Sequence, residues 1–130
     1  ACLKANRETR MSKDFNELER TVRSDGRMLA AAAPETMKAF GALGRAAYAN
    51  GALDTKTKEL ISFALSVAAR CDGCLAYHGS RLAELGASRE EVMDAIGVAI
   101  QMGGGPSVVY GGEALRAFDS FATEPAAAAE

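Results

Sequence analysis

The chain has 130 residues, of which 48% are hydrophobic and 25% are charged, and its formal net charge is −2. This length suits one domain with a buried core, and the charge balance gives no basic surface for nucleic acid or an anionic membrane. No run of about 18 apolar residues predicts a membrane span, and no export signal is visible. We therefore expect neither nucleic acid nor a membrane among its partners.

The two ends of the chain differ from its middle. Residues 1–10 show neither a helical period nor capping residues, and Met11 begins a stretch that resembles a natural start. We expect residues 1–10 to be an added or disordered leader, in which Cys2 is incidental. We expect residues 11–122 to form a single domain, and residues 123–130, which are low in complexity, to be a frayed tail.

The first predicted helix is short. Ser12 or Asp14 can cap it, because their side chains accept hydrogen bonds from the free N–H groups of a first turn. A turn at Ser24-Asp25-Gly26 is predicted to end this helix. Its apolar residues, at roughly helical spacing, are Phe15, Leu18 and Val22.

The second predicted helix begins at Pro34, since proline at the first helical position loses no hydrogen bond. Its apolar residues recur every three or four positions and predict one buried face. Asn50-Gly51 is predicted to end it with a left-handed cap. The residues of the predicted buried face are Met37, Phe40, Leu43, Ala47 and Tyr48.

The third predicted helix is apolar almost all round. Asp54 is its expected N-cap, and after Glu59 the ten residues from Leu60 to Ala69 include only Ser62 and Ser66 as polar side chains. Such a helix belongs in the middle of a domain or an oligomer. Glu59, Ser62 and Ser66 are spaced i, i+3 and i+7, so we expect them to form one polar line along it.

Three more helices complete the chain. The fourth follows the cysteine pair and is closed by Gly86. The fifth opens with a capping box at Ser88–Glu91, and the last covers Ser107–Phe121 after a glycine-rich break at residues 102–106. No strand pattern is visible, so we predict a compact all-α bundle of about six helices. The apolar residues of the fifth helix are Val92, Ala95, Ile96, Ala99 and Ile100.

The chemically reactive side chains gather in one motif. Cys71, Cys74 and His78 form the pattern C-x-x-C-x-x-x-H, which holds two of the three cysteines and the one histidine. On a helix these residues share one face. A helix start favours a thiolate over a thiol, and His78 can take the proton of Cys74. Glu59 can orient His78 if the third and fourth helices pack together.

The spacing of the cysteines also bears on the compartment. A secreted disulfide scaffold spreads an even number of cysteines along the chain, whereas here two of three lie only three positions apart. This pattern favours an intracellular protein with a chemically active pair, and we expect it to be cytoplasmic.

Other roles fit these residue types less well. A structural zinc site needs four ligands, and only Cys71, Cys74 and His78 are local. Haem attachment needs the histidine directly after the second cysteine. We therefore expect no metal and no bound cofactor, while an inert core pair of cysteines stays an alternative. We interpret Ser62 and Ser66 as packing residues, and Tyr77 and Tyr110 as core or pocket wall.

With these residues in view, the chain resembles the carboxymuconolactone decarboxylase-like family, specifically its alkylhydroperoxidase D-like branch. The resemblance covers roughly residues 34–118. It is carried by Glu59, a C-x-x-C pair that begins twelve residues later, and His78 four residues after the second cysteine. The segments at 82–91 and 102–106 also look like the family. At Gly73 the chain departs from members that carry another histidine there.

The resemblance implies a fold and an activity. The fold would be an all-α bundle that assembles as an obligate homo-oligomer, a trimer or hexamer. The activity would be that of a peroxiredoxin-type thiol peroxidase, or disulfide reductase, acting on a hydroperoxide. Cys74 would attack the peroxide, Cys71 would resolve the sulfenic acid as a disulfide, and Glu59 with His78 would relay protons. An external dithiol, a dihydrolipoyl group in this branch, would reduce the disulfide.

Two other functions stay open from the sequence. A carboxymuconolactone decarboxylase-type lyase is the enzyme alternative, although that branch generally lacks the cysteine pair. A redox-sensing oligomer with little turnover is the alternative from a different class. Peroxide consumption with a dithiol supply separates the peroxidase from both.

Overall fold

The structure is a computed structural model that describes residues 13–122, and these residues fold into helices without strands. The predicted leader at 1–10, the predicted tail at 123–130 and Ser12 lie outside the described residues. The predicted all-α bundle is confirmed. Its helices are α2 (Phe15–Ala32), α3 (Pro34–Tyr48), α4 (Thr55–Ala69), α5 (Asp72–Glu84), α6 (Arg89–Gly103) and α7 (Gly105–Phe121).

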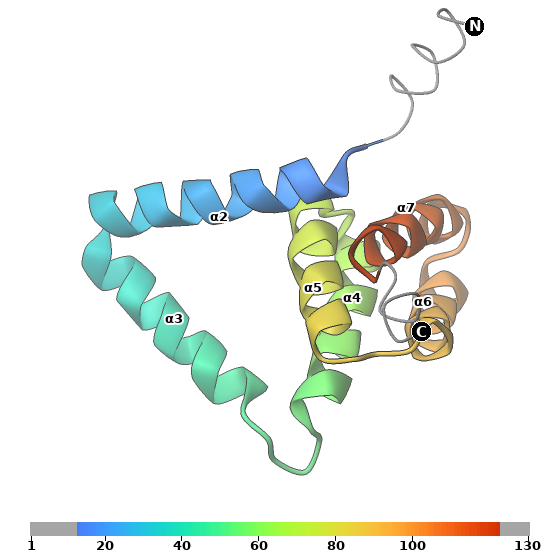
Figure 1. Cartoon of the computed structure of the whole chain (residues 1–130). Helices are drawn as coiled ribbons and strands as arrows, with labels where there is room; N and C mark the ends of the chain where they lie inside the picture. The colour runs from blue at the N-terminus through green and yellow to red at the C-terminus, as the bar shows by residue number, and fades with distance from the viewer. Residues whose placement is uncertain (1–12, 123–130) are drawn as a thin grey trace, which may run out of the picture.

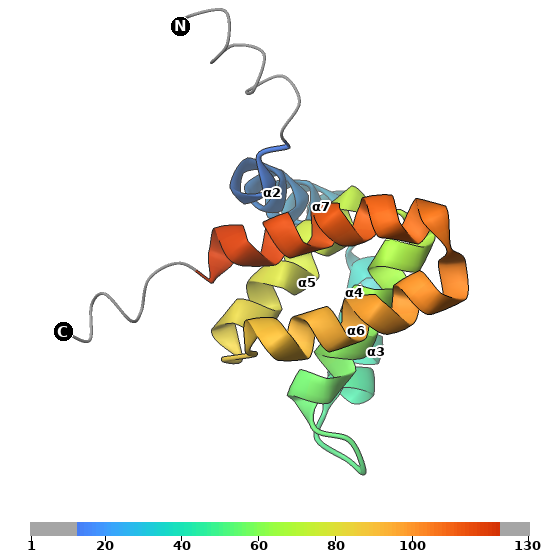
Figure 2. The same cartoon turned by 90° about the vertical axis from the view of Figure 1, so that its right-hand side faces the viewer.

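Four helices, α4 to α7, form the packed body of the molecule. Helices α4 and α5 lie side by side, and α6 and α7 pack against them and against each other (Figure 1). Seen after a quarter turn, α6 and α7 run alongside one another across this body (Figure 2). Between residues 13 and 122 no helix is both long and apolar enough to cross a bilayer.

Helices α2 and α3 form an arm outside this body. The start of α2 packs on α5 and α7, and α3 returns to the start of α4. Together with the α4–α5 pair, α2 and α3 outline three sides of a triangle (Figure 1). The arm is therefore held to the body at its two ends.

The hydrophobic core explains this division. Phe63 of α4 and Phe118 of α7 are the largest buried side chains of the core. Phe15 is the one fully buried residue of α2. All other core residues come from α4 to α7 or from the segment just before α6. They are Val67, Leu75, Ala76, Leu82, Ala87, Val92, Ile96, Ala99, Ala114 and Ala117.

The predicted helix ends are largely confirmed. Asp14 accepts a hydrogen bond from the Glu17 N–H at the start of α2. Asp54 does the same for Thr57 at the start of α4, and hydrogen bonds from the Thr57 side chain and backbone hold the pKa of Asp54 below its ordinary value. Helix α6 opens with the predicted capping box at Ser88–Glu91. Gly86 has the left-handed conformation, with φ of 73°.

The predicted turn at Ser24-Asp25-Gly26 is wrong, because α2 continues through it to Ala32. These residues are poor helix formers, but the chain beyond them is rich in alanine, the best one. The helix stops where Pro34 follows, since proline disfavours helical backbone in the residue before it. Ala33 accordingly leaves the helical region, with φ of −136° and ψ of 67°.

The prediction that the second helix has a buried face is also wrong within a single chain. No residue of α3 is buried, and Phe40 and Leu43 are 66% and 63% exposed. The periodicity is real, but α3 lies in the arm and, among the described helices, contacts only α2 and α4.

The left-handed cap predicted at Gly51 is wrong as well, because α3 ends at Tyr48 and Ala49 is extended. Helix α7 begins at Gly105, two residues before the predicted Ser107.

Two adjacent glycines show how closely α6 and α7 pack. A Cβ atom placed on Gly111 of α7 would lie 2.9 Å from Cγ2 of Ile96 on α6, which is closer than real contacts. A Cβ atom on Gly112 would meet only the end of the Arg116 side chain, at 4.0 Å. The absence of a side chain at Gly111 therefore lets the two helices approach.

We predict opposite effects for alanine at these two positions. Gly112→Ala gains helix propensity and raises the free energy of unfolding by roughly 0.5–1 kcal/mol. Gly111→Ala has the same gain but overpacks against Ile96, which costs about 1–3 kcal/mol. Urea unfolding of both variants at one protomer concentration measures the difference. Equal midpoints for the two variants would contradict the close α6–α7 contact.

Candidate active site

The site is built on a tight connection between α4 and α5. Arg70 takes a left-handed conformation with φ of 53°, and the N–H of Cys71 donates to the carbonyl of Ser66 at 3.1 Å. This closes α4 in the manner of a Schellman motif. Helix α5 begins at Asp72, so two residues separate the helices. The polar line of α4 is therefore turned back onto the cysteine-bearing helix.

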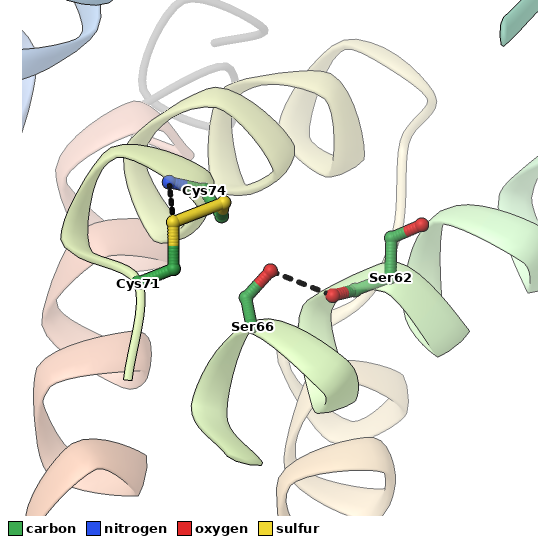
Figure 3. Close-up of a disulfide and its surroundings, with 4 residues drawn as sticks. All are labelled: Ser62, Ser66, Cys71 and Cys74. Atoms are coloured by element: carbon green, nitrogen blue, oxygen red, sulfur yellow. Dashed lines mark hydrogen bonds between the residues drawn. A yellow bond between two sulfur atoms is a disulfide. The ribbon is translucent and has the colours of Figure 1, made fainter. Parts of the chain in front are cut away.

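Cys71 and Cys74 lie at the start of α5 and form a disulfide, with their Cα atoms 5.2 Å apart (Figure 3). Cys71 is the N-cap of the helix, and its Sγ accepts a hydrogen bond from the Cys74 N–H at 3.2 Å. Both residues are half-buried. When the disulfide is reduced, the helix start favours negative charge on sulfur.

A carboxylate–histidine pair lies further along the same two helices. Oε2 of Glu59, on α4, is 2.6 Å from Nδ1 of His78, on α5. Glu59 is only 3% exposed, and a carboxylate buried this deeply needs such partners. Helices α4 and α5 do pack together, and this contact is the one that the predicted orienting role of Glu59 requires.

Arg81 is a second partner of Glu59 that the sequence analysis missed. Its Nε lies 3.8 Å from Glu59 Oε1, while its Nη1 donates to Glu84 at 2.7 Å. Arg81 follows His78 by three positions on α5, a spacing that places both on one helix face. That spacing was the signal in the sequence. The guanidinium group stabilises the buried negative charge beside the histidine.

The predicted polar line on α4 faces α5 in register. Glu59 lies level with His78, and Ser66 lies level with Cys71, whose N–H it binds. The Ser66 hydroxyl is buried and donates to the carbonyl of Ser62 at 2.7 Å (Figure 3). The structure thus brings Glu59 to His78 and Cys71 to Cys74, while Cys74 and His78 are one turn apart on α5.

Similarity to known proteins identifies the family of this chain. The model of the carboxymuconolactone decarboxylase family matches residues 34–119. The chain belongs to the carboxymuconolactone decarboxylase family. This membership confirms the family resemblance seen in the sequence, and the matched stretch includes Glu59, both cysteines and His78.

Relatives and solved structures agree with this membership. An uncharacterized protein of Cupriavidus necator is 39% identical over 92 residues, which is 71% of this chain and 81% of its own. Uncharacterized protein 4 in the cox locus of Paracoccus denitrificans is 37% identical over 81 residues, 62% of this chain and 73% of its own. The crystal structure of a family member from Legionella pneumophila is 44% identical, with a TM-score of 0.82 over 83% of this chain and 96% of that one.

A further family member has a suggested biological role. The crystal structure of a Thermotoga maritima family protein, with a suggested role in an antioxidative response, is 32% identical to this chain. It matches with a TM-score of 0.67 over 83% of this chain and 89% of its own.

The arm of this family member also reaches the site, which the sequence did not reveal. The Tyr48 hydroxyl, at the end of α3, is hydrogen-bonded to the Ser62 hydroxyl. The Tyr77 ring meets the His78 ring edge-on at 5.1 Å, and Arg23 of α2 lies 5.3 Å from the centre of the Tyr77 ring. Tyr77, which we interpret as core or pocket wall, is half-buried. Tyr48 and Arg23 come from helices distant in the sequence.

Gly73 lies against α2. A Cβ atom at this position would be 3.1 Å from Cγ2 of Val22, tighter than most real contacts. A larger side chain between the cysteines, such as the histidine of some family members, would press on α2. In this chain the space beside the cysteine pair is therefore occupied by the arm.

Charged residues lie together near the start of α5. Nζ of Lys13 lies 2.9 Å from Asp72 and 3.3 Å from Glu113. Burial disfavours the lysine charge, but the two carboxylates outweigh it and raise the pKa of Lys13. Among residues 13–122, no group of three or more histidine, cysteine or acidic side chains is placed to hold a metal ion. Cys2, which the sequence analysis expects to be incidental, lies outside these residues.

We predict that Glu59 and His78 are energetically coupled. Replacing either by alanine leaves the other buried without its partner, so the double variant loses less stability than the sum of the single losses. The expected coupling is about 0.5–3 kcal/mol, measured by urea unfolding of Glu59→Ala, His78→Ala and the double variant. A matched cycle of His78→Ala with Ser88→Ala, at the N-cap of α6, is the additive control. Additivity in the first cycle would contradict the contact.

Proposed function

We propose that this protein is a thiol-dependent peroxidase of the alkylhydroperoxidase type, which reduces hydroperoxides through the Cys71–Cys74 pair. The observation that carries the proposal is the α4–α5 hairpin itself. It holds a half-buried disulfide pair one helical turn from a histidine that is bound to a buried carboxylate. The suggested antioxidative role of the Thermotoga maritima relative supports the same chemistry.

The carboxylate defines the role of each histidine nitrogen. An ionised Glu59 accepts a hydrogen bond from Nδ1–H of His78, at 2.6 Å. Neutral histidine carries one proton, so its Nε2 is then the basic nitrogen. In the reduced enzyme Nε2 takes the proton of the Cys74 thiol, and Glu59 stabilises the imidazolium that results. Cys74 becomes the nucleophile, because the thiolate is the reactive form.

The oxidative half of the cycle follows. The Cys74 thiolate attacks the terminal oxygen of a hydroperoxide, so an S–O bond forms as the O–O bond breaks. The sulfur is oxidised by two electrons to a sulfenic acid, and the leaving oxygen takes a proton to give an alcohol. Cys71 then attacks the Cys74 sulfur, water leaves, and the disulfide forms. Their Cα separation of 5.2 Å lies within the ordinary disulfide range.

An external dithiol closes the cycle. It attacks the disulfide, gives a mixed disulfide and then leaves as a cyclic or linear disulfide, so two electrons return to the cysteine pair. A dihydrolipoyl group is the reductant that we propose, with no cofactor bound to the protein. Because the cycle depends on a supply of dithiols, we place the protein in the cytoplasm, where thiols are kept reduced.

The alternatives make different use of the same residues. A carboxymuconolactone decarboxylase-type lyase, which removes a carboxyl group from a lactone, has no need for a cysteine pair, so the disulfide geometry does not favour it. A redox-sensing oligomer would form the same disulfide but would turn over slowly. Steady consumption of peroxide with dihydrolipoamide supports the peroxidase and counts against the sensor.

We predict different outcomes for the two cysteines. Cys74→Ser abolishes consumption of an organic hydroperoxide with dihydrolipoamide, because the attacking sulfur is gone. Cys71→Ser also stops turnover, but it allows a sulfenic acid to accumulate on Cys74, which a dimedone adduct and intact-mass measurement detect. An adduct in Cys74→Ser and none in Cys71→Ser would reverse the two roles. Unchanged turnover in both variants would remove the proposal.

We also propose that the protein is a homo-oligomer, a trimer or hexamer. Helix α3 buries none of its own side chains, and large apolar residues of the arm are exposed. Single chains rarely leave such a face in water. The exposed apolar residues of the arm are Met28, Leu29, Phe40 and Leu43.

The oligomer is tested by mass in solution. Size-exclusion chromatography with light scattering is expected to give at least three times the chain mass of 13.6 kDa. Phe40→Asp, which places a charge on the exposed face, is expected to shift the protein toward smaller species, whereas Lys38→Asp is the control for an added acid on α3. A monomer at micromolar concentration would contradict the proposal.

A further inference from the structure

A pair of hydroxyl groups lies beside His78 and has no part in the cycle described above. The Tyr48 hydroxyl is hydrogen-bonded to the Ser62 hydroxyl, and the Tyr48 ring centre is 6.1 Å from that of His78. Tyr48 is the last residue of α3, whereas Ser62 lies in the middle of α4. The arm of the molecule thus delivers one hydroxyl to the site, and the body supplies the other.

The position of Tyr48 is fixed by the loop that follows it. The Thr55 hydroxyl donates to the carbonyl of Tyr48 at 2.8 Å, and the Lys58 ammonium donates to the carbonyl of Ala49 at 2.5 Å. The Asn50 side chain accepts from the Thr55 N–H at 2.9 Å. These bonds hold the end of α3 on the first turn of α4. Tyr48 is therefore a placed side chain, although α3 as a whole is exposed.

The contacts between α4 and α5 show how far along these two helices the Tyr48–Ser62 pair lies. Glu59 is level with His78, and Ser66 is level with Cys71. Ser62 lies between Glu59 and Ser66 on α4, about one turn from each. On α5, Cys74 lies in the same way between Cys71 and His78. Along α4, Ser62 therefore lies between the levels of His78 and Cys71, and Figure 3 shows Ser66 nearer to the two cysteines and Ser62 one turn beyond it.

The hydrogen bonds leave one donor of the pair unused. Two hydroxyl groups carry two O–H hydrogens between them, and the bond between them uses one. Within residues 13–122, neither hydroxyl has another partner at hydrogen-bond distance. Ser66 differs, because its hydroxyl is committed to the carbonyl of Ser62. Tyr48 and Ser62 are half-buried rather than enclosed, so the unused O–H is not sealed inside the protein.

We propose that the Tyr48–Ser62 pair donates a hydrogen bond to the leaving oxygen of a hydroperoxide that reacts at Cys74. This inference rests on the proposed peroxidase function. When the Cys74 thiolate attacks the terminal oxygen, negative charge develops on the other oxygen of the breaking O–O bond. A donor placed at that oxygen stabilises the transition state more than the bound substrate.

The proton balance of the step assigns separate roles. The thiol proton of Cys74 passes to His78, and from there it reaches the leaving oxygen, so that an alcohol departs. The hydroxyl pair supplies a hydrogen bond and no net proton. Sulfur loses two electrons, and the O–O bond gains them. Peroxides with a poor, strongly basic leaving group need this donor most.

The test compares two oxidants that differ in the leaving group. tert-Butyl hydroperoxide releases an alkoxide, which needs a donor, whereas peroxyacetic acid releases a carboxylate, which does not. The reduced full-length protein and its Tyr48→Phe and Ser62→Ala variants are mixed with each oxidant near neutral pH without reductant. Thiol loss is followed by rapid quench and intact mass, with Cys74→Ser giving the background. Tyr110→Phe, which removes a phenol from α7, is the matched control.

Specific outcomes support the inference. With tert-butyl hydroperoxide, the variant that loses the donating hydroxyl falls in rate by about 100-fold, and the other variant falls less. With peroxyacetic acid both variants keep most of their rate, and Tyr110→Phe behaves like the unmodified protein with both oxidants. The order of the two variants then shows which hydroxyl faces the substrate.

Other outcomes overturn it. Equal losses with both oxidants would mean that the pair only supports the structure around Cys74. Unchanged rates with tert-butyl hydroperoxide would mean that the pair takes no part, although the peroxidase function would stand. If the unmodified protein reacts with neither oxidant faster than Cys74→Ser, the proposed function fails, and this inference fails with it.

Discussion

The contact between Glu59 and His78 is the constraint on which the rest of the site depends. A carboxylate that is 3% exposed loses most of its hydration, so it persists only with partners that replace the lost water. Its partners, His78 and Arg81, both come from α5, and this fixes the register of that helix against α4. Once the register is set, the position of the cysteine pair along α4 is also set. The electrostatic need of one buried acid thus places both sulfur atoms.

The arm has a different relation to the site. Helices α2 and α3 add one fully buried core residue, Phe15, and their other residues are exposed or half-buried, so they contribute less to the core than the body does. They nevertheless bring Val22 against Gly73 and Tyr48 against Ser62. The first contact is made at Gly73, between the two cysteines, and the second lies near His78. In this chain the arm contributes neighbours of the site, while the body holds the cysteines, Glu59 and His78.

Much of the site could be predicted from local sequence, because its members are close along the chain. Capping residues such as Asp54 and Ser88 act within one turn, and the spacing from Cys71 to His78 needs only a helix to become a shared face. Contacts between distant segments were not readable in this way. The turn expected at residue 24 failed because alanine-rich sequence beyond it extended the helix. The buried face expected for α3 failed because periodicity shows that a face is apolar without showing what covers it.

The sulfur of Cys71 makes two interactions, and the reduced sulfur makes one of them more strongly than the disulfide sulfur does. It is half of the disulfide, and it is also the atom that accepts the Cys74 N–H and so begins α5. A thiolate is a stronger acceptor than a disulfide sulfur, so release of Cys71 improves the first hydrogen bond of the helix. A dithiol that attacks the Cys74 sulfur therefore expels a leaving group that the backbone is already placed to receive. In the proposed cycle, the N–H of Cys74 would thus stabilise the sulfur that reduction releases.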